Sequence, residues 1–85
     1  MEFYRTRRFR KAYRRLSQHD RVRVEDALRR FASNPLHPSL NVERIKESIW
    51  SFRVSLSVRC TFEFSGSLQD LKHVKSVTLR NVGHQ

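Results

Sequence analysis

Apolar residues near the start of the chain recur with the spacing of helix faces. Two stretches place them at i, i+3, i+4 and i+7, which is one face of an α-helix. The residues concerned are Phe9, Ala12, Tyr13 and Leu16 in the first stretch and Val24, Ala27, Leu28 and Phe31 in the second. Ser17 followed by Asp20 resembles a capping box and predicts the start of the second helix. Asn34 precedes a proline and predicts its end. The pattern predicts a helical hairpin that must bury its apolar stripes on another layer.

Further along the chain the apolar positions alternate, as in a strand with one buried face. The alternating stretches are 49–57, 58–64 and 74–82, with shorter candidate strands at 2–4 and 42–46. Residues 68–72 fit neither pattern. The side chains predicted to face inward are Trp50, Phe52, Val54, Leu56, Val58, Cys60, Phe62, Phe64, Val74, Val77 and Leu79. The opposite face would carry Arg53, Arg59 and other polar residues into solvent.

This element order predicts an α+β fold in a single domain over residues 1–85. An N-terminal strand and a two-helix hairpin would pack on one face of a mostly antiparallel sheet of about four strands, in the order β-α-α-β-β-β. The predicted helix–sheet core consists of Phe9, Tyr13, Leu16, Val24, Leu28, Phe31, Trp50, Val54, Phe62 and Leu79.

The charge balance adds a functional constraint to this fold. The 18 Lys and Arg against 8 Asp and Glu leave a net charge of +10. Residues 1–40 contain 11 basic and 4 acidic side chains, and residues 41–85 contain 7 and 4. Such an excess favours a polyanion, or an acidic protein partner that masks the charge.

Other chemistries are disfavoured. One cysteine excludes a disulfide framework and a Cys-based zinc site, and the four histidines include no i, i+4 pair, so we expect no metal and no cofactor. No apolar run approaches the roughly 20 residues that span a bilayer, and no export signal follows the basic N-terminus. These features suit the reducing cytoplasm.

The basic excess is concentrated on the first predicted helix. No acidic residue is interleaved, so neither i, i+4 ion pairing nor solubility requires this arrangement. We expect this face to contact RNA or an acidic partner, the alternative being a solvated helix face. The residues are Arg7, Arg8, Arg10, Lys11, Arg14 and Arg15.

Several phrases of the sequence, together with the element order, resemble the RelE/ParE superfamily of bacterial toxins from type II toxin–antitoxin pairs. The resemblance covers nearly the whole chain. The phrases are Phe9-x-x-Ala12-Tyr13-x-x-Leu16, Asn34-Pro35-x-His37-Pro38-Ser39-Leu40, Ile49-Trp50-Ser51-Phe52-Arg53-Val54, Val58-Arg59-Cys60-Thr61-Phe62-Glu63-Phe64 and Leu79-Arg80-Asn81-Val82-Gly83-His84.

The resemblance implies one fold with two activities. RelE-like members cleave messenger RNA in the ribosomal A site without a metal, whereas ParE-like members bind DNA gyrase and cleave nothing. Both are neutralised by a cognate antitoxin protein. The charge favours RNA over gyrase as the target, so the resemblance leads us to expect a ribosome-associated messenger RNA endoribonuclease that blocks translation. The alternatives are a gyrase inhibitor and a cleavage-deficient relative that binds only RNA or the antitoxin.

Metal-free RNA cleavage needs cations for the phosphate and groups that move protons. Arg59 best matches the family pattern as a phosphate clamp, with a solvated residue paired to Glu63 or Glu47 as the alternative. Arg53 would stand beside it on the neighbouring strand. The remaining catalytic candidates are His84, Lys46 and Arg80, with His73 also available.

His84 departs from the family pattern. Relatives carry a histidine one position later, where this chain has Gln85, and often a tyrosine beyond it. That departure favours the cleavage-deficient alternative. A frayed terminal residue is the other interpretation of His84.

The remaining conspicuous residues have structural interpretations. His37 is expected to hydrogen-bond loop backbone, Trp50 to join the core, and Cys60 to be buried and inert. We also expect an antitoxin segment, amphipathic and partly acidic, to cover the Arg53/Arg59 face or the basic first helix.

Overall fold

A hydroxyl side chain begins each helix, and for the second helix it is the predicted Ser17. Thr6 Oγ1 accepts a hydrogen bond from Phe9 N at 3.1 Å and starts α1 (Arg7–Arg15). Ser17 Oγ accepts from Asp20 N at 3.1 Å and starts α2 (Gln18–Ser33), which ends at Asn34. These caps satisfy backbone N–H groups that a first helical turn leaves unpaired. The computed structural model describes residues 1–84.

Five strands form one mixed sheet in the order β1-β5-β4-β3-β2. β1 runs parallel to β5, and all other neighbours are antiparallel. The sheet thus has one strand more than the expected four. The two short candidate strands, at 2–4 and 42–46, both pair with the sheet and form its two edges. The bounds are β1 Glu2–Arg5, β2 Glu43–Lys46, β3 Ile49–Arg53, β4 Val58–Glu63 and β5 Ser76–His84, with 3-10 turns at Pro38–Leu40 and Leu68–Lys72.

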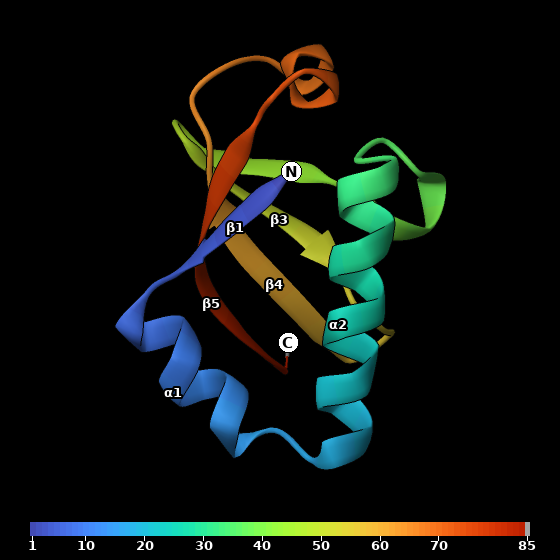
Figure 1. Ribbon diagram of the computed structural model, residues 1–85, viewed down its shortest axis with the longest axis vertical. Helices are drawn as coiled ribbons and strands as arrows, with labels where there is room; N and C mark the ends of the chain where they lie inside the picture. Colours follow the sequence, from blue (N-terminus) through green and yellow to red (C-terminus); the bar gives the residue numbers. More distant parts are fainter. Residues whose placement is uncertain (85) are drawn as a thin grey trace.

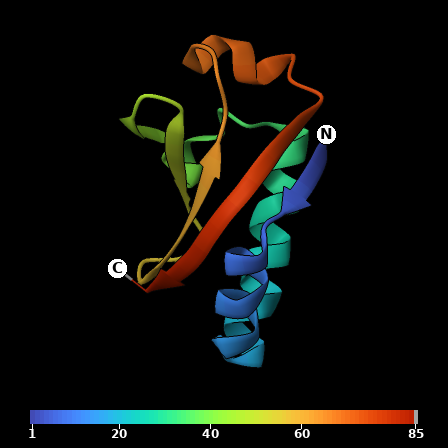
Figure 2. The ribbon, with the colours of Figure 1, turned by 90° about the vertical axis from the view of Figure 1, so that its left-hand side faces the viewer.

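Both helices cover the same face of the sheet and leave the other face open (Figure 2). α1 packs on β5, and α2 crosses the centre, where the Phe31 ring lies 5.0 Å from Phe52 and 5.1 Å from Phe62. The helices diverge from the turn that joins them (Figure 1). Every predicted core residue is buried except Tyr13, which is half-buried.

Polar side chains occupy the space beside Tyr13. Arg5 donates to Glu25 at 3.0 Å, and its guanidinium lies 5.5 Å from the ring centres of Phe9 and Tyr13. This network joins β1, α1 and α2 where the helices separate.

The predicted strand over residues 49–57 ends early. β3 stops at Arg53, and residues 54–57 form a turn closed by Val54 N and Ser55 N, which both donate to Val58 O. Leu56, predicted to face inward, is therefore 88% exposed. Apolar and polar residues continue to alternate through this turn, so the alternation does not show where the strand ends.

A β-bulge changes the register within β5. Thr61 pairs with Asn81 while Phe62 pairs with Leu79, so Arg80 is the extra residue. Leu79 and Val82 consequently both reach the core although three positions separate them.

Among the described residues, no helix is both long and apolar enough to cross a membrane.

Candidate functional site

Two arginines stand side by side on the open face of the sheet. Arg53 of β3 is the direct register partner of Arg59 of β4, and opposed residues of antiparallel strands project from the same face. The neighbouring residue of β5 is Gly83, where an added Cβ would meet no atom within 4 Å. The pair therefore borders open space. The structure confirms the predicted juxtaposition of the arginines.

Arg59 is held by two neighbours. Its Nη1 donates to Ser51 Oγ at 3.0 Å, and its Nη2 lies 3.8 Å from Glu43 Oε1. Asn41 Nδ2 donates to the same carboxylate oxygen at 3.1 Å. These contacts fix the guanidinium in a side chain that is only 22% exposed. Arg59 pairs with Glu43. The interpretation of Arg59 as a solvated residue paired to Glu63 or Glu47 named the wrong partners.

Arg53 is less well satisfied. Its Nε is buried and has no hydrogen-bond partner in the described part of the chain. An unpaired buried donor costs about 1–3 kcal/mol, and two like charges placed opposite each other add repulsion. An anion bound between Arg53 and Arg59 would relieve both costs, since guanidinium groups match phosphate oxygens.

Sequence reasoning missed Glu43 and Ser51. Both depend on register: Glu43 of β2 pairs with Ser51 of β3, one row along the open face from the arginine pair. Ser51 is only 3% exposed although its alternation predicted an outward residue. The only signal in the sequence was the candidate strand at 42–46. Its own residues do not indicate its register against the neighbouring strand.

His84 does not join the arginines. Its register partner is Val58, whose side chain is fully buried under the helices, so His84 projects from the helix-covered face. There its Nε2 lies 3.5 Å from Asp20 Oδ2 at the start of α2. The contrast with Gly83, which lies beside Arg59, follows from strand alternation. Gln85 lies outside the described residues.

Lys46 and Arg80 also lie apart from the pair. Lys46 aligns with Ile49, four positions along β3 from Arg53, or about 13 Å at 3.3 Å per residue. Arg80 donates from Nη1 to Glu63 Oε1 at 3.0 Å. Thr6, Arg8, Glu63 and Arg80 line a cavity of about 320 Å³. Arg80 thus adjoins the basic helix rather than Arg59.

The basic side chains of α1 are all exposed, and within residues 1–84 none of them forms an ion pair. Arg5 differs, because it is bound to Glu25. The surface formed by Arg7, Arg8, Arg10, Lys11, Arg14 and Arg15 is called the α1 basic face below.

The other residues discussed from sequence have structural roles. His37 Nδ1 accepts from Ser39 N at 3.1 Å, as expected for a loop histidine. Trp50 is buried, and its Nε1 donates to Phe64 O at 3.0 Å. Cys60 is fully buried, and burial raises the pKa of its thiol, which stays neutral and inert. His73 is exposed after the 3-10 turn at Leu68–Lys72.

Comparison with known proteins identifies the fold. No protein-family model and no curated protein sequence matches the chain. Among solved structures, a YoeB/ParE toxin from Agrobacterium tumefaciens superposes with a TM-score of 0.73 at 18% identity, over 100% of this chain and 99% of that one.

Two toxin–antitoxin complexes are also similar. The RelB–RelE complex from Methanococcus jannaschii gives a TM-score of 0.69 at 20% identity, covering 95% of this chain and 88% of the other. The intact E. coli RelBE complex gives 0.67 at 15% identity, covering 99% and 95%. The chain has the RelE/ParE toxin fold.

Proposed function

We propose that this chain is the toxin of a type II toxin–antitoxin pair and acts as a ribosome-associated messenger RNA endoribonuclease. The observation that carries the proposal is the Arg53/Arg59 pair on the open sheet face, with a buried Arg53 Nε that lacks an acceptor. The shared fold with RelE-type toxins, some of them solved with their antitoxins, supports the toxin role and an antitoxin partner. The net charge of +10 favours RNA as target.

The chemistry requires no cofactor in this proposal. The RNA 2′-oxygen attacks the adjacent phosphorus, a 2′,3′-cyclic phosphate forms, and the 5′-oxygen leaves with a proton taken from water. Glu43, whose carboxylate lies beside Arg59, accepts the 2′-hydroxyl proton. Arg59 and Arg53 stabilise the added negative charge on the phosphate oxygens. Neither His84 nor Lys46 stands next to the arginines, so neither is assigned a proton-transfer step.

A second function, RNA binding without cleavage, has one observation in its favour. His84 lies on the helix-covered face and contacts Asp20. The family resemblance suggested His84 as a proton-transfer residue, but it does not lie beside Arg53 and Arg59. In that case the protein would occupy RNA or the ribosome and arrest translation by obstruction. Gyrase inhibition is the third possibility.

The decisive experiment is induced expression in a bacterial host, followed by mapping of RNA ends on translated messages. We expect codon-phased cuts with the unaltered protein and a loss of about 10²–10³ in cleavage rate for Arg59→Ala. Glu43→Gln should lose cleavage while still binding RNA. Lys75→Ala, an exposed change away from the site, is the matched control.

The other outcomes separate the alternatives. Intact messages with growth arrest that depends on Arg59 would support binding without cleavage. Intact messages with a DNA-damage response would support gyrase. Growth arrest that survives Arg59→Ala would place the activity away from the arginine pair. His84→Ala should retain cleavage, and a loss near 10² would return the acid–base role to His84.

A further inference from the structure

The carboxylate to which the proposed reaction gives a proton is exposed and stands on an edge strand. The Glu43 side chain is 55% exposed, and β2 lies at the end of the sheet, so no described strand covers its outer side. A glutamate in such a place has several rotamers open to it in water. A general base must instead be held within hydrogen-bond reach of the proton that it takes. A polar contact rather than packing must therefore orient Glu43.

Asn41, two residues earlier in the chain, makes that contact. Its Nδ2 donates to Glu43 Oε1 at 3.1 Å, the same oxygen that lies 3.8 Å from Arg59 Nη2. Both donors thus approach one oxygen of the carboxylate. Within residues 1–84, no hydrogen bond reaches the other oxygen, Oε2. The arrangement therefore fixes the carboxylate and leaves Oε2 open to accept a proton.

The backbone of Asn41 lies in the left-handed region, with φ 44° and ψ 55°. Residues other than glycine are uncommon there, and asparagine is among the few that tolerate it. Glycine would adopt the same conformation at no steric cost. The turn by itself therefore has no need of the amide group that Asn41 directs to Glu43.

The loop that precedes Asn41 gives its side chain a rigid base. Leu40 is fully buried, and Asn41 N donates to Pro38 O at 3.1 Å. His37 Nδ1 accepts from Ser39 N at 3.1 Å and closes the start of the same turn. These contacts anchor the loop to the core, so the amide is held at a fixed place relative to β2.

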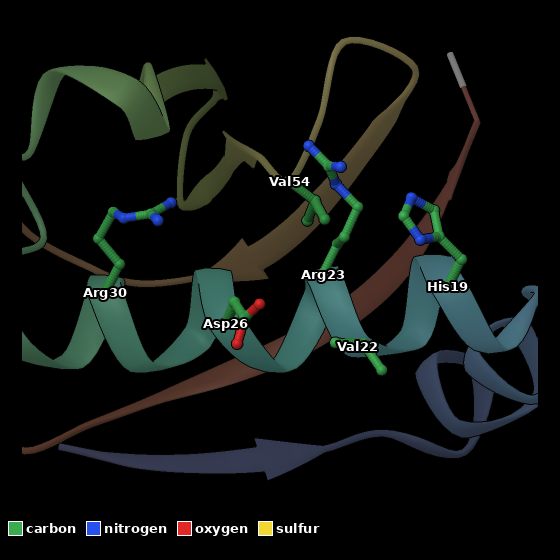
Figure 3. A pocket seen from close by; sticks show the side chains of 6 residues that line it. All are labelled: His19, Val22, Arg23, Asp26, Arg30 and Val54. Atoms are coloured by element: carbon green, nitrogen blue, oxygen red, sulfur yellow. The ribbon is translucent and has the colours of Figure 1, made fainter.

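Neither helix can hold Glu43 in this way, because both cover the other face of the sheet (Figure 2). Figure 3 shows Arg23 and Arg30 of α2 on the side where Val54 lies, and Val54 directly follows Arg53 in the chain. The loop at 34–42, in contrast, leads straight into β2. It is the segment outside the sheet that reaches the carboxylate.

We propose that Asn41 is a positioning residue for RNA cleavage, which holds Glu43 with its Oε2 directed at the RNA 2′-hydroxyl. The inference rests on the proposed function. Oε2 takes the 2′-hydroxyl proton as the bond from the 2′-oxygen to phosphorus forms, and the bond from phosphorus to the 5′-oxygen breaks. Asn41 itself gains and loses no proton. A base oriented by a third group is a recurring arrangement in enzymes.

The test measures the cleavage rate of a defined message on programmed ribosomes at saturating protein, and separately the affinity of the protein for those ribosomes. Asn41→Gly removes the amide and keeps the left-handed backbone. It should lower the rate by about tenfold and leave the affinity unchanged within about twofold. Asn41→Asp tolerates the same backbone but places a second carboxylate beside Glu43, so it should lose at least as much.

The matched control is Glu47→Gly in the turn between β2 and β3. Glu47 also has a positive φ, 46°, and it is exposed. Its replacement makes the same kind of backbone change four residues from Glu43 in the chain but removes no contact to that carboxylate. We expect Glu47→Gly to cleave at the rate of the unaltered protein.

A double variant separates positioning from structural damage. If Asn41 acts through Glu43, then Asn41→Gly combined with Glu43→Gln should cleave as slowly as Glu43→Gln alone, within about twofold. Structural damage would instead multiply the two losses. Thermal unfolding of each variant verifies that it is folded.

Each contrary result has its own meaning. Normal cleavage by Asn41→Gly and Asn41→Asp, or a further loss in the double variant, would overturn the positioning role and leave the proposed function intact. A loss of ribosome affinity equal to the loss of rate would make Asn41 a direct RNA contact instead. Absence of cleavage by the unaltered protein would overturn the proposed function and this inference together.

Discussion

At the scale of single residues, the arginines differ in whether they find an acceptor. Arg5 is bound to Glu25 and lies over two aromatic rings, so its charge stabilises the fold. Arg59 is partly satisfied by Ser51 and Glu43, and Arg53 Nε is unsatisfied. A buried donor left without a partner destabilises the empty protein. Of these three arginines, Arg53 therefore has the most to gain from a ligand that supplies an acceptor.

Glu25 makes folding stability depend on pH. Partial burial acts to raise the pKa of its carboxyl, but hydrogen bonds from Arg5 and Tyr13 and the charge of Arg5 outweigh it and lower the pKa from its ordinary value of 4.5. The folded pKa lies below the unfolded one, so the stabilisation is complete above about pH 4.5 and is lost as the pH falls through the folded value.

We therefore expect Glu25→Gln to reduce stability at neutral pH and to flatten the loss of stability in acid, because glutamine cannot titrate. Urea unfolding followed by circular dichroism between neutral pH and about pH 3 measures this difference. Parallel curves for the two proteins would show that Glu25 does not contribute to the acid sensitivity.

At the scale of elements, α2 stabilises the fold through one buried stripe of apolar side chains. Leu28 is 3% exposed within that stripe, and its replacement would leave a cavity between helix and sheet. Leu28→Ala should lower the free energy of unfolding by about 2–5 kcal/mol, a large share of the total for so small a domain.

A change on the opposite side of the same helix provides the control. Val22 is 52% exposed, and alanine has the higher helix propensity, so Val22→Ala should leave thermal stability unchanged or slightly raised. A melting temperature that does not fall in Leu28→Ala would show that α2 is not packed as described.

At the scale of the whole molecule, the net charge of +10 favours association with polyanions such as RNA. If the α1 basic face neutralises phosphates of a single strand, the logarithm of the binding constant should fall with the logarithm of salt concentration by about 0.7 per phosphate contacted. Arg7→Gln with Arg10→Gln should reduce that slope by about 1.4.

Binding of a labelled single-stranded RNA at several salt concentrations measures the slope. Lys72→Gln with Lys75→Gln removes the same charge elsewhere on the surface and should leave it almost unchanged. Equal slopes for the two double variants would mean that α1 makes no phosphate contacts of its own.

The sequence alone determined the fold class, the presence of both helices, the start and end of the second helix, and nearly all of the core. Helical spacing, strand alternation and caps such as Ser17 are local, so they can be read without knowing what packs against them. Alternation also predicted that Arg53 and Arg59 share a face, which the register confirms.

Only the tertiary structure decided how the strands align, and the candidate site depends on that alignment. Glu43 reaches Arg59 because β2 pairs with β3 in one register, and His84 projects to the helix-covered face because it is opposite Val58. A shift of one residue moves every side chain of a strand to the other face. Register is set by turns, a bulge and packing between residues distant in sequence, so no local pattern could have placed Glu43 beside Arg59 or His84 beside Asp20.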